Sequence, residues 1–473
     1  MKTIYNAFLL FIFEKRTSIR VIAISILIVI VILTTSCDNF VEVDLPTSQL
    51  TSKTVFEDVT TANAAMTGVY AKLRDTGLLT GNSTGLTCRL GLYTDELDYY
   101  KSNDPNYFYT NSLYSAEAGI QDLWNQSYNV IYAANAVVEG ISASHSLAQK
   151  DRDRLRGEAL FVRTLVHFYL LNLYGDIPYV TTTDYTYNST IHKAPTPEIY
   201  GKIITDLEEA TLVLPEKYSS PERVRPNRAT AQALLARVYL YMGLWAEAAN
   251  SASAVLNNPL YSWEPDLDKI FLKESTATIW QFKPDSDSGN TKEGNLFVFN
   301  SAPPPTVALT INLVNAFDPI DQRKTHWIRA ITKGTTTWYH SFKYKRNAKA
   351  ADSNEYSIVF RLAEQYLIRA EARALQGDLI GAKEDLNVIR HTAGLPNTTA
   401  VSAIEIREAI IKERRLEFFT EFGHRFFDLK RVGNLDSALS FSKPKWSDND
   451  ALWPIPAQEL SANPNLNPQN TGY

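Results

Sequence analysis

Beyond residue 55 the chain is dominated by apolar residues that recur every three or four positions, the spacing that places side chains on one face of a helix. This pattern predicts helices over residues 56–74, 119–140, 151–174, 197–213, 228–242, 245–257, 360–376, 379–391 and 403–422. Several of these helices come in pairs. The sequence therefore predicts a mainly α fold.

Two of the predicted pairs, residues 228–257 and 361–391, share one pattern. Each turns at a glycine, Gly243 or Gly377. Small residues lie at the same offsets from both turns: Ala236, Ala248, Ala370 and Ala382. Small side chains allow two helices to approach closely, as in tetratricopeptide repeats. Because the turns are much farther apart than the ~34-residue period of a tandem array, we expect four tetratricopeptide-like pairs at irregular spacing, separated by long insertions.

Two stretches lack the helical period. The longer one, residues 260–358, contains successive prolines at 303–305, a polar run at 285–290 and the alternating segment 278–282. This texture predicts loops and short strands inserted into a helical scaffold. The second stretch, residues 81–115, is rich in tyrosine. Irregular segments on a rigid scaffold commonly carry binding sites, so both stretches are candidates for the functional surface.

The N-terminal region has the layout of a secretory signal. A basic flank precedes the almost wholly apolar stretch from Val21 to Leu33, and small residues then lead to Cys37. A cysteine in this place predicts the lipidated first residue of a bacterial lipoprotein. The alternative is a transmembrane anchor, although the stretch is shorter than the ~20 residues that cross a bilayer core. The predicted parts are a signal peptide (1–36), a lipidated tether (37–54) and one domain (55–473) that contains the insertion 260–358.

Charge and cysteine content narrow the class of protein. The chain carries a net charge of −5, and removal of the basic segment 1–36 leaves the mature chain more acidic. This disfavours a nucleic-acid partner, which requires a clustered positive surface. With Cys37 lipidated, Cys88 has no disulfide partner and is predicted to be a small buried hydrophobic residue. The scattered histidines give no zinc-site spacing, so neither a metal nor another cofactor is predicted.

A cluster of charged residues near the C-terminus could suggest catalysis, because paired carboxylates can act as acid and base. The cluster consists of Glu413, Arg414, Glu417, Glu421, Arg425 and Asp428. Its three glutamates are spaced to lie on one helix face, where the two arginines can pair with them. We interpret the cluster as a structural ion-pair network. Glycoside hydrolysis would require a separated acid and nucleophile in a cleft, for which the sequence gives no warrant.

Other motifs that carry chemistry are missing. The polar run 285–290 begins like a calcium loop, but Asn290 and Leu296 stand where such a loop requires glycine and glutamate. We therefore interpret it as a solvated turn. The sequence contains no phosphate-binding loop and no nucleophile elbow. An enzyme is not predicted.

Six regions, in this order, resemble the SusD/RagB family of nutrient-binding outer-membrane lipoproteins. They are Cys37–Asp38 with Val43–Ser48, Arg156–Thr164 with Tyr174–Pro178, Arg228–Gly243, Asn387–Arg390 with Ala393–Pro396, Glu413–Glu417 with Gly423–Arg431, and Trp453–Pro456 with Asn463–Asn467 and Gly472–Tyr473. The resemblance runs from Cys37 to Tyr473, and the common order of the regions makes it specific.

The resemblance implies a non-catalytic role at the cell surface. SusD-like proteins are lipid-anchored to the outer membrane, face outward and cover a SusC-like TonB-dependent transporter. They bind a glycan, an oligo- or polysaccharide, and help to deliver it to the transporter without cutting it. Alternatives that stay open are the same role for peptides or glycoproteins, a surface hydrolase, and an adaptor that binds protein partners in tetratricopeptide grooves.

Aromatic side chains are the candidate ligand contacts. Sugar rings present flat C–H faces, which a Tyr or Trp ring can cover while the sugar hydroxyls stay hydrogen-bonded at its edge. The resemblance implies that the ligand surface is built from the loop after the first helices and from the middle insertion. The candidate platform residues in these regions are Tyr99, Tyr100, Tyr107, Tyr109, Trp327, Trp338 and Tyr339.

Overall fold

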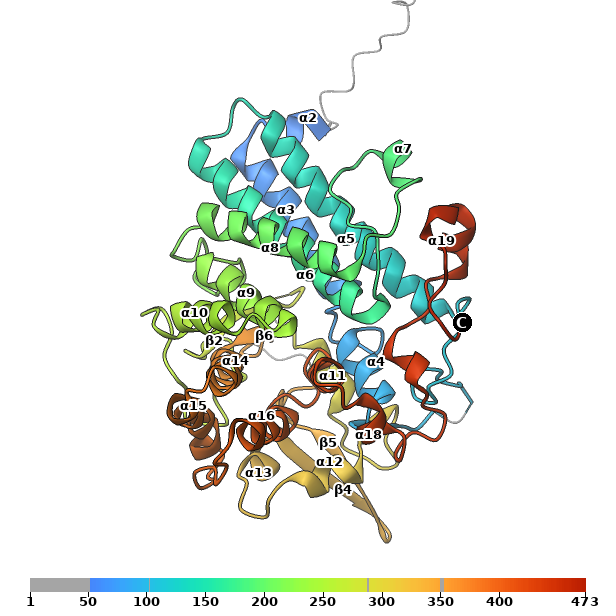
Figure 1. Ribbon diagram of the computed structural model, residues 1–473, viewed down its shortest axis with the longest axis vertical. Coiled ribbons are helices and arrows are strands. Elements are labelled where there is room, and N and C mark those ends of the chain that lie inside the picture. The colour runs from blue at the N-terminus through green and yellow to red at the C-terminus, as the bar shows by residue number, and fades with distance from the viewer. Residues whose placement is uncertain (1–51, 102, 287–288, 349–352) are drawn as a thin grey trace, which may run out of the picture. The chain divides into compact units, whose positions relative to one another are not determined.

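The computed structural model describes residues 52–473, with gaps at 102, 287–288 and 349–352 (Figure 1). The predicted signal peptide, the lipidation site Cys37 and most of the predicted tether lie outside the described residues. Helices account for about 52% of the structure, which confirms the mainly α class. No helix in the described part is both long enough and apolar enough to cross a membrane.

Every helix predicted from the apolar period is present, and most ends fall within a few residues of the prediction. These helices are α3 (Val59–Asp75), α5 (Ala118–Ala143), α6 (Gln149–Tyr174), α8 (Thr196–Val213), α9 (Arg228–Met242), α10 (Trp245–Leu256), α14 (Leu362–Leu375), α15 (Leu379–Thr392) and α16 (Ala403–Glu417).

Shorter helices, which the period did not predict, join these long ones. They are α2 (Ser52–Val55), α4 (Leu86–Tyr93), α7 (Tyr185–Asn188), α11 (Lys292–Phe297), α12 (Ile311–Ala316), α13 (Arg323–Trp327), α17 (His424–Arg431), α18 (Leu435–Leu439), α19 (Ala457–Ala462) and the 3₁₀ turns η1 (Asp448–Ala451) and η2 (Pro464–Leu466). Of these, α4 lies in the stretch 81–115, which was expected to be irregular.

The ends of α16 follow from its local sequence. Its first turn is closed by a capping box, in which the Ser402 hydroxyl accepts from the Glu405 amide and the Glu405 side chain accepts from the Ser402 amide. The predicted end at residue 422 was wrong. Thr420, Phe422 and Gly423 have positive φ angles of 54°, 42° and 76°. A chain in this left-handed region cannot continue a right-handed helix, so α16 ends at Glu417.

The long helices pack in a row in chain order, each against the next: α5, α6, α8, α9, α10 and α14 with α15. Both predicted hairpins are present, with Gly243 and Gly377 at φ values of 74° and 90°. They are stacked directly, because α10 packs against α14. A buried ion pair also joins them, in which Arg237 Nη2 lies 2.7 Å from Glu364 Oε2. The long insertion between the hairpins therefore leaves the helical array unbroken (Figure 1).

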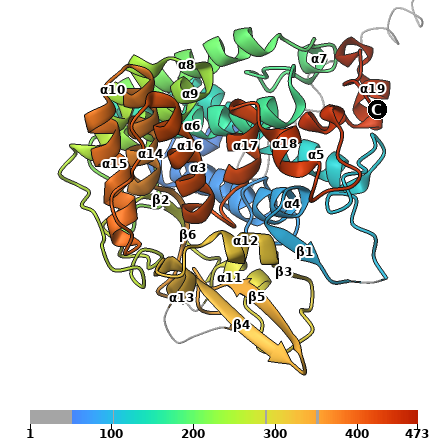
Figure 2. The same cartoon turned by 60° about the horizontal axis from the view of Figure 1, so that its bottom comes forward.

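The strands lie almost entirely in the insertion, as predicted. A four-stranded antiparallel sheet has the order β1 (Leu97–Tyr99), β3 (Val307–Leu309), β5 (Thr336–Ser341) and β4 (Ile328–Lys333). A second sheet pairs β2 (Thr278–Phe282) with β6 (Ser357–Arg361). Because β1 comes from the tyrosine-rich stretch 81–115, its pairing with β3 brings the two irregular stretches together. Figure 2 shows β4 and β5 projecting from the side of the helical array.

Two main clusters of buried apolar residues support these elements. The larger one lies between the helices and includes Trp280 and Trp453, both fully buried. A second cluster lies beneath the four-stranded sheet and includes Leu97, Leu309 and Cys88. Cys88 is buried, as predicted, and burial raises the pKa of its thiol to about 12. The sheet is thus fixed to the scaffold through one of its faces.

Candidate functional site

The pairing register of the strands determines which of the candidate aromatic side chains lie on the same face of the sheet. Leu309 of β3 stands opposite both Leu97 of β1 and Tyr339 of β5. Since side chains alternate along a strand, Tyr99 and Tyr339 share the face of the sheet that packs on the second apolar cluster. By the same alternation Tyr100 and Trp338 lie on the opposite face, where both are half-buried. Burial, reinforced by the Asp98 charge, raises the pKa of Tyr100.

A second group of contacts surrounds Asp98 of β1. The Tyr109 hydroxyl donates a hydrogen bond of 3.2 Å to Asp98 Oδ1. The Tyr109 ring lies 6.3 Å from the Tyr99 ring, centroid to centroid. Burial, reinforced by the Asp98 charge, raises the pKa of Tyr109 to about 12. The structure therefore brings together Tyr99, Tyr109 and the carboxylate of Asp98, a residue that was not among the candidates.

Trp327 was predicted as a platform residue, and this prediction was wrong. Its side chain is 0% exposed and belongs to the apolar cluster beneath the sheet. The indole N–H donates to the Leu267 carbonyl oxygen at 3.0 Å, and the Phe271 ring packs edge-on against it. A ligand on the surface cannot reach this ring. The physical reason is that Trp327 ends α13 and points into the core, where it holds the insertion in place.

Tyr107 is separated from the other candidates by its packing. Its ring is half-buried against the larger, helical cluster and makes an edge contact of 5.2 Å with the ring of Tyr114. Tyr114, which was not predicted, is 45% exposed. This pair therefore forms a separate aromatic patch on the same tyrosine-rich stretch.

A cavity of about 450 Å³ opens beside β1, and most of the residues that line it are polar. Its lining includes Asp98, Tyr109, Asn111 and Lys443. Asn111 is 4% exposed, and its Nδ2 donates to the Tyr93 carbonyl oxygen at 3.0 Å. Its Oδ1 is buried and has no hydrogen-bond partner among the described residues. A buried carbonyl of this kind is costly to leave unpaired, so it favours a ligand that supplies a donor.

Lys443 supplies the opposite kind of group to the cavity. Its Nζ donates to the carbonyl oxygens of Leu92 (2.6 Å) and Tyr109 (3.2 Å), and lies 4.3 Å from the centroid of the Tyr109 ring. Burial lowers the pKa of Lys443 to about 8 and raises the pKa of the Asp98 carboxyl above its usual value. The cavity thus offers a donor and two acceptors, the arrangement that suits a ligand with several hydroxyl groups.

The rim of the cavity carries an unusual apolar side chain. Phe441 is 94% exposed, and Ile311 on the other side of the rim is 55% exposed. Asn111, Phe441 and Lys443 were all missed by the sequence analysis. The tyrosine-rich stretch drew attention to the neighbourhood of Asn111, but nothing in the sequence indicates that the distant segment 441–445 lies against it.

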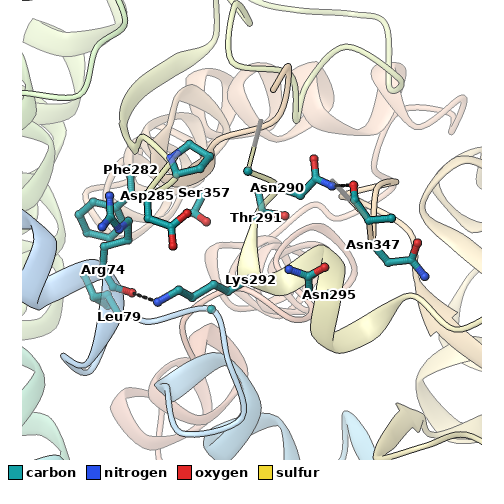
Figure 3. Close-up of a pocket in the computed structure, with 14 residues that line it drawn as sticks. Arg74, Leu79, Phe282, Asp285, Asn290, Thr291, Lys292, Asn295, Asn347 and Ser357 are labelled. Carbon is teal, nitrogen blue, oxygen red and sulfur yellow. Dashed lines mark hydrogen bonds between the residues drawn. The ribbon is translucent and has the colours of Figure 1, made fainter. Parts of the chain in front are cut away.

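A different cavity, of about 400 Å³, is lined by Arg74, Lys292 and residues of the insertion (Figure 3). The cationic side chains of Lys292 and Arg74 already pair with a carboxylate of the protein. Lys292 Nζ lies 2.7 Å from Asp75 Oδ1, and Arg74 Nε donates to the same oxygen at 2.8 Å. The Lys292 ammonium also donates to the Arg74 carbonyl oxygen at 3.5 Å, drawn dashed in Figure 3. With its charges paired internally, this cavity offers less to a ligand than the one beside β1.

The C-terminal carboxylates form the predicted structural ion-pair network. Glu413 pairs with Arg323 at 2.6 Å, Glu417 with Arg361 at 2.5 Å and Glu421 with Lys343 at 2.6 Å, all of them buried. Because these three carboxylates are buried and paired with cations, they do not form a free carboxylate pair that faces a cleft.

Two details of that network differ from the prediction. Arg414 and Arg425 do not pair with the three glutamates. Arg414 Nε lies 2.7 Å from Asp428 Oδ2, and Arg425 Nε lies 2.9 Å from Asp95 Oδ1. The partners of the glutamates come instead from the insertion, from β6 and from α15, whose Arg390 lies 3.2 Å from Glu413 Oε2. Among the described residues no cluster of three or more His, Cys, Asp or Glu side chains is arranged to hold a metal ion.

Comparison with known proteins gives a consistent result. Residues 48–240 match a family model described as "Starch-binding associating with outer membrane", and residues 321–473 match the model described as "SusD family". Among curated proteins, SusD-like protein P2 of Formosa agariphila is 29% identical, over 90% of this chain and 95% of that protein.

Solved structures share the fold. A structure described as a laminarin-binding SusD-like protein superimposes with a TM-score of 0.74 at 24% identity, covering 88% of this chain and 99% of the other. Surface glycan-binding protein A from Bacteroides fluxus gives a TM-score of 0.72 at 22% identity, with 88% and 99% covered. At these identities the likeness establishes a common architecture.

Proposed function

The chain belongs to the SusD/RagB family, and on this basis we propose that it binds glycans at the bacterial surface and delivers them to a SusC-like TonB-dependent transporter. In this proposal lipid on Cys37 anchors the protein to the outer membrane, facing outward. The family description supports an outer-membrane association, and the two glycan-binding structures of the same fold support the ligand class.

One observation supports a glycan as the ligand: aromatic rings and groups that can bind hydroxyls lie together beside β1. Tyr109 lines a cavity whose buried Asn111 oxygen lacks a donor and whose Lys443 nitrogen provides one. Sugars combine C–H faces with hydroxyl groups, so they match both features. A dissociation constant of ~1 mM corresponds to only about 4 kcal/mol, which a few stacked rings and hydrogen bonds can supply.

We propose that Tyr100 and Trp338 extend this site over the outer face of the sheet. Tyr99, Tyr107 and Tyr339 remain proposed contacts through their exposed edges, since each is half-buried. Trp327 is left out because it is buried.

The proposed role is binding without catalysis. Retaining and inverting glycosidases require two carboxyl groups facing the scissile bond. Of the two carboxylates in the cavity lining, Asp95 is held by Arg415 at 2.7 Å and by Arg425 at 2.9 Å, which leaves Asp98 without a second free carboxylate. Incubation of a bound polysaccharide with the protein should therefore leave its chain length unchanged. Shortened products would favour the hydrolase alternative.

Calorimetry of the soluble chain starting at Asp38, against a panel of polysaccharides and peptides, tests the proposal directly. Binding to one glycan class is expected. Phe441→Ala should weaken it roughly fivefold, because stacking on an aromatic ring is worth about 1 kcal/mol. Leu212→Ala, at a 79% exposed position of α8 outside the cavity lining, is the matched control and should bind normally. Binding to peptides alone would move the function to proteinaceous nutrients.

The membrane and transporter parts of the proposal have their own test. In cells, Cys37→Ser should move the protein from the outer-membrane fraction to the soluble fraction, because acyl chains contribute ~0.8 kcal/mol of membrane affinity per buried methylene. The unaltered protein should co-purify from membranes with a TonB-dependent transporter. Retention of the variant in the membrane would favour the transmembrane-anchor alternative.

A further inference from the structure

A larger cavity, of about 610 Å³, lies among α5, the segment around α7 and the C-terminal α19 and η2. It shares no lining residue with the cavity beside β1. Both views place α7 and α19 well away from β4 and β5, at the other end of the molecule (Figures 1 and 2). Any ligand held here would bind separately from one on the sheet.

One wall of this cavity is an aromatic stripe along α5. Trp124, Tyr128 and Tyr132 are spaced four residues apart, so they lie on one helix face. Trp124 is 3% exposed, and its ring packs 4.9 Å from that of Tyr128, whose hydroxyl donates to the Pro178 carbonyl oxygen at 2.9 Å. These two rings are fixed by the core. The third ring, that of Tyr132, follows these two fixed rings along the same face of α5.

Tyr132 at the end of the stripe is different. Its side chain is 54% exposed. Within the part of the chain that the structure describes, it makes no ring contact and no hydrogen bond. A large, rigid ring in this position offers an open flat surface to a ligand at little cost in side-chain entropy.

Polar groups complete the cavity, most of them amides. Asn125, Asn129, Asn188 and Asn463 all line it. The Asn188 Nδ2 donates to the Thr182 carbonyl oxygen at 2.8 Å, whereas its buried Oδ1 finds no partner among the described residues. The cavity therefore combines an unpaired buried acceptor with an exposed aromatic ring. This combination favours a ligand that has both hydroxyl groups and an apolar face.

The charges of the residues that line the cavity further restrict the class of ligand that can bind. Among the described residues that line the cavity, none is Lys, Arg or His, and the single ionisable acid is Glu459. Burial raises the pKa of the Glu459 carboxyl. A phosphate or carboxylate ligand would find no cation here and would be repelled by Glu459. The lining therefore disfavours an anionic ligand and admits an uncharged one.

We propose that this cavity is a second glycan-binding site, specific for uncharged sugars, in which Tyr132 covers a sugar face and Asn188 accepts a sugar hydroxyl. The proposal rests on the proposed glycan-binding function for its ligand class, but it places that ligand at a site independent of the sheet. Two separate sites would let one polysaccharide chain bind at two points, which strengthens its retention by effective concentration.

The test uses calorimetry of the full soluble chain with a panel of neutral polysaccharides, starch and laminarin among them, and their oligosaccharides. Trp338→Ala together with Phe441→Ala disables the sheet site, and in this background neutral glycan binding should persist. Adding Tyr132→Ala should weaken the remaining binding at least fivefold, whereas Tyr132→Phe should preserve it. Tyr185→Ala is the matched control, since Tyr185 is 83% exposed on α7 but is not part of the lining.

The outcomes are distinguishable. If the sheet-site variant loses all binding and Tyr132→Ala alone changes nothing, the second site is refuted while the proposed function stands. If no neutral glycan binds the unaltered chain, the second site fails, and binding of anionic glycans would still uphold the broader function. If polygalacturonate binds in a Tyr132-dependent way, the specificity for uncharged sugars is refuted. Equal melting temperatures of the variants show that folding is unaffected.

Discussion

Two tryptophans of the insertion, Trp327 and Trp338, should respond in opposite ways to the same substitution. Both stand in similar polar surroundings in the sequence, but the structure buries the first and leaves the second half-exposed. Trp327→Ala should destabilise the protein. Trp338→Ala should weaken glycan binding and leave stability nearly unchanged.

The magnitude for Trp327 follows from its contacts. Replacing a fully buried tryptophan by alanine costs about 3–5 kcal/mol through lost transfer energy and the cavity left behind. The substitution also removes the donor of the Leu267 carbonyl at 3.0 Å, an interaction worth about 1 kcal/mol. We expect the free energy of unfolding to fall by roughly 4–6 kcal/mol. With an unfolding entropy of about 2 cal/mol/K per residue, this lowers the melting temperature of so large a domain by roughly 5 °C.

The assay pairs differential scanning calorimetry with binding calorimetry on the glycan identified in the panel. Trp338→Ala should shift the melting temperature by less than about 1 °C, because a half-exposed ring contributes little to the core. Its affinity should fall roughly fivefold. The reasoning about burial is refuted if Trp327→Ala keeps the normal melting temperature, or if Trp338→Ala loses stability and affinity together.

Three further predictions test the charged groups. Glu417→Gln should lower the free energy of unfolding by about 3 kcal/mol in urea titrations, because it removes the buried carboxylate that pairs with Arg361 at 2.5 Å and with Arg323 at 2.9 Å; an unchanged midpoint would contradict the assigned network. Burial lowers the pKa of His167 to about 3, against about 6.5 in an unfolded chain, so the unfolded state takes up the proton first and stability falls as pH drops from 6.5 toward 3. His167→Gln should flatten that part of the urea-midpoint profile relative to the unaltered protein. Since the pKa of Lys443 is about 8, glycan affinity should fall between pH 7 and 9, and Lys443→Met should abolish this dependence; a pH-independent affinity in the unaltered protein would remove Lys443 from the site.

The helical scaffold was predictable because its signal is local. Apolar spacing located the long helices, and the glycines at 243 and 377 located two of their turns. The direct stacking of the hairpins was not predictable, since it depends on which helix surfaces meet after a long insertion. The Arg237–Glu364 pair that joins them has no signature in either segment alone.

Trp327 shows how a local signal can mislead about a site. The residues before it, which include Asp321 and Arg323, are mostly polar, and polar residues are commonly exposed to solvent. Both residues are in fact buried, because Arg323 is neutralised by Asp321 at 2.8 Å and by Glu413 and Glu417 across the structure. Polar residues indicate exposure only when their charges lack partners, and Glu417, one of the partners of Arg323, lies 94 residues away in the chain.

The cavity beside β1 could be predicted only in part. The tyrosine-rich stretch pointed to Tyr109 and its neighbours because the composition there is unusual. Asn111 and Lys443 are ordinary residues in their own segments, and they become functional candidates only because the segment 441–445 folds against the end of α4 and the loop after β1. A contact of this kind is set by the tertiary fold.

The pairing of β1 with β3 has a consequence for how the protein is made. Its two strands are separated by most of the helical array, and Asp95 beside them is held by Arg415 and Arg425 near the other end of the chain. Contacts between such distant segments form late, because the intervening chain must first be ordered. A nascent chain can therefore assemble its early helices while it still lacks a finished binding surface. The cavity beside β1 is complete only once translation has passed residue 443.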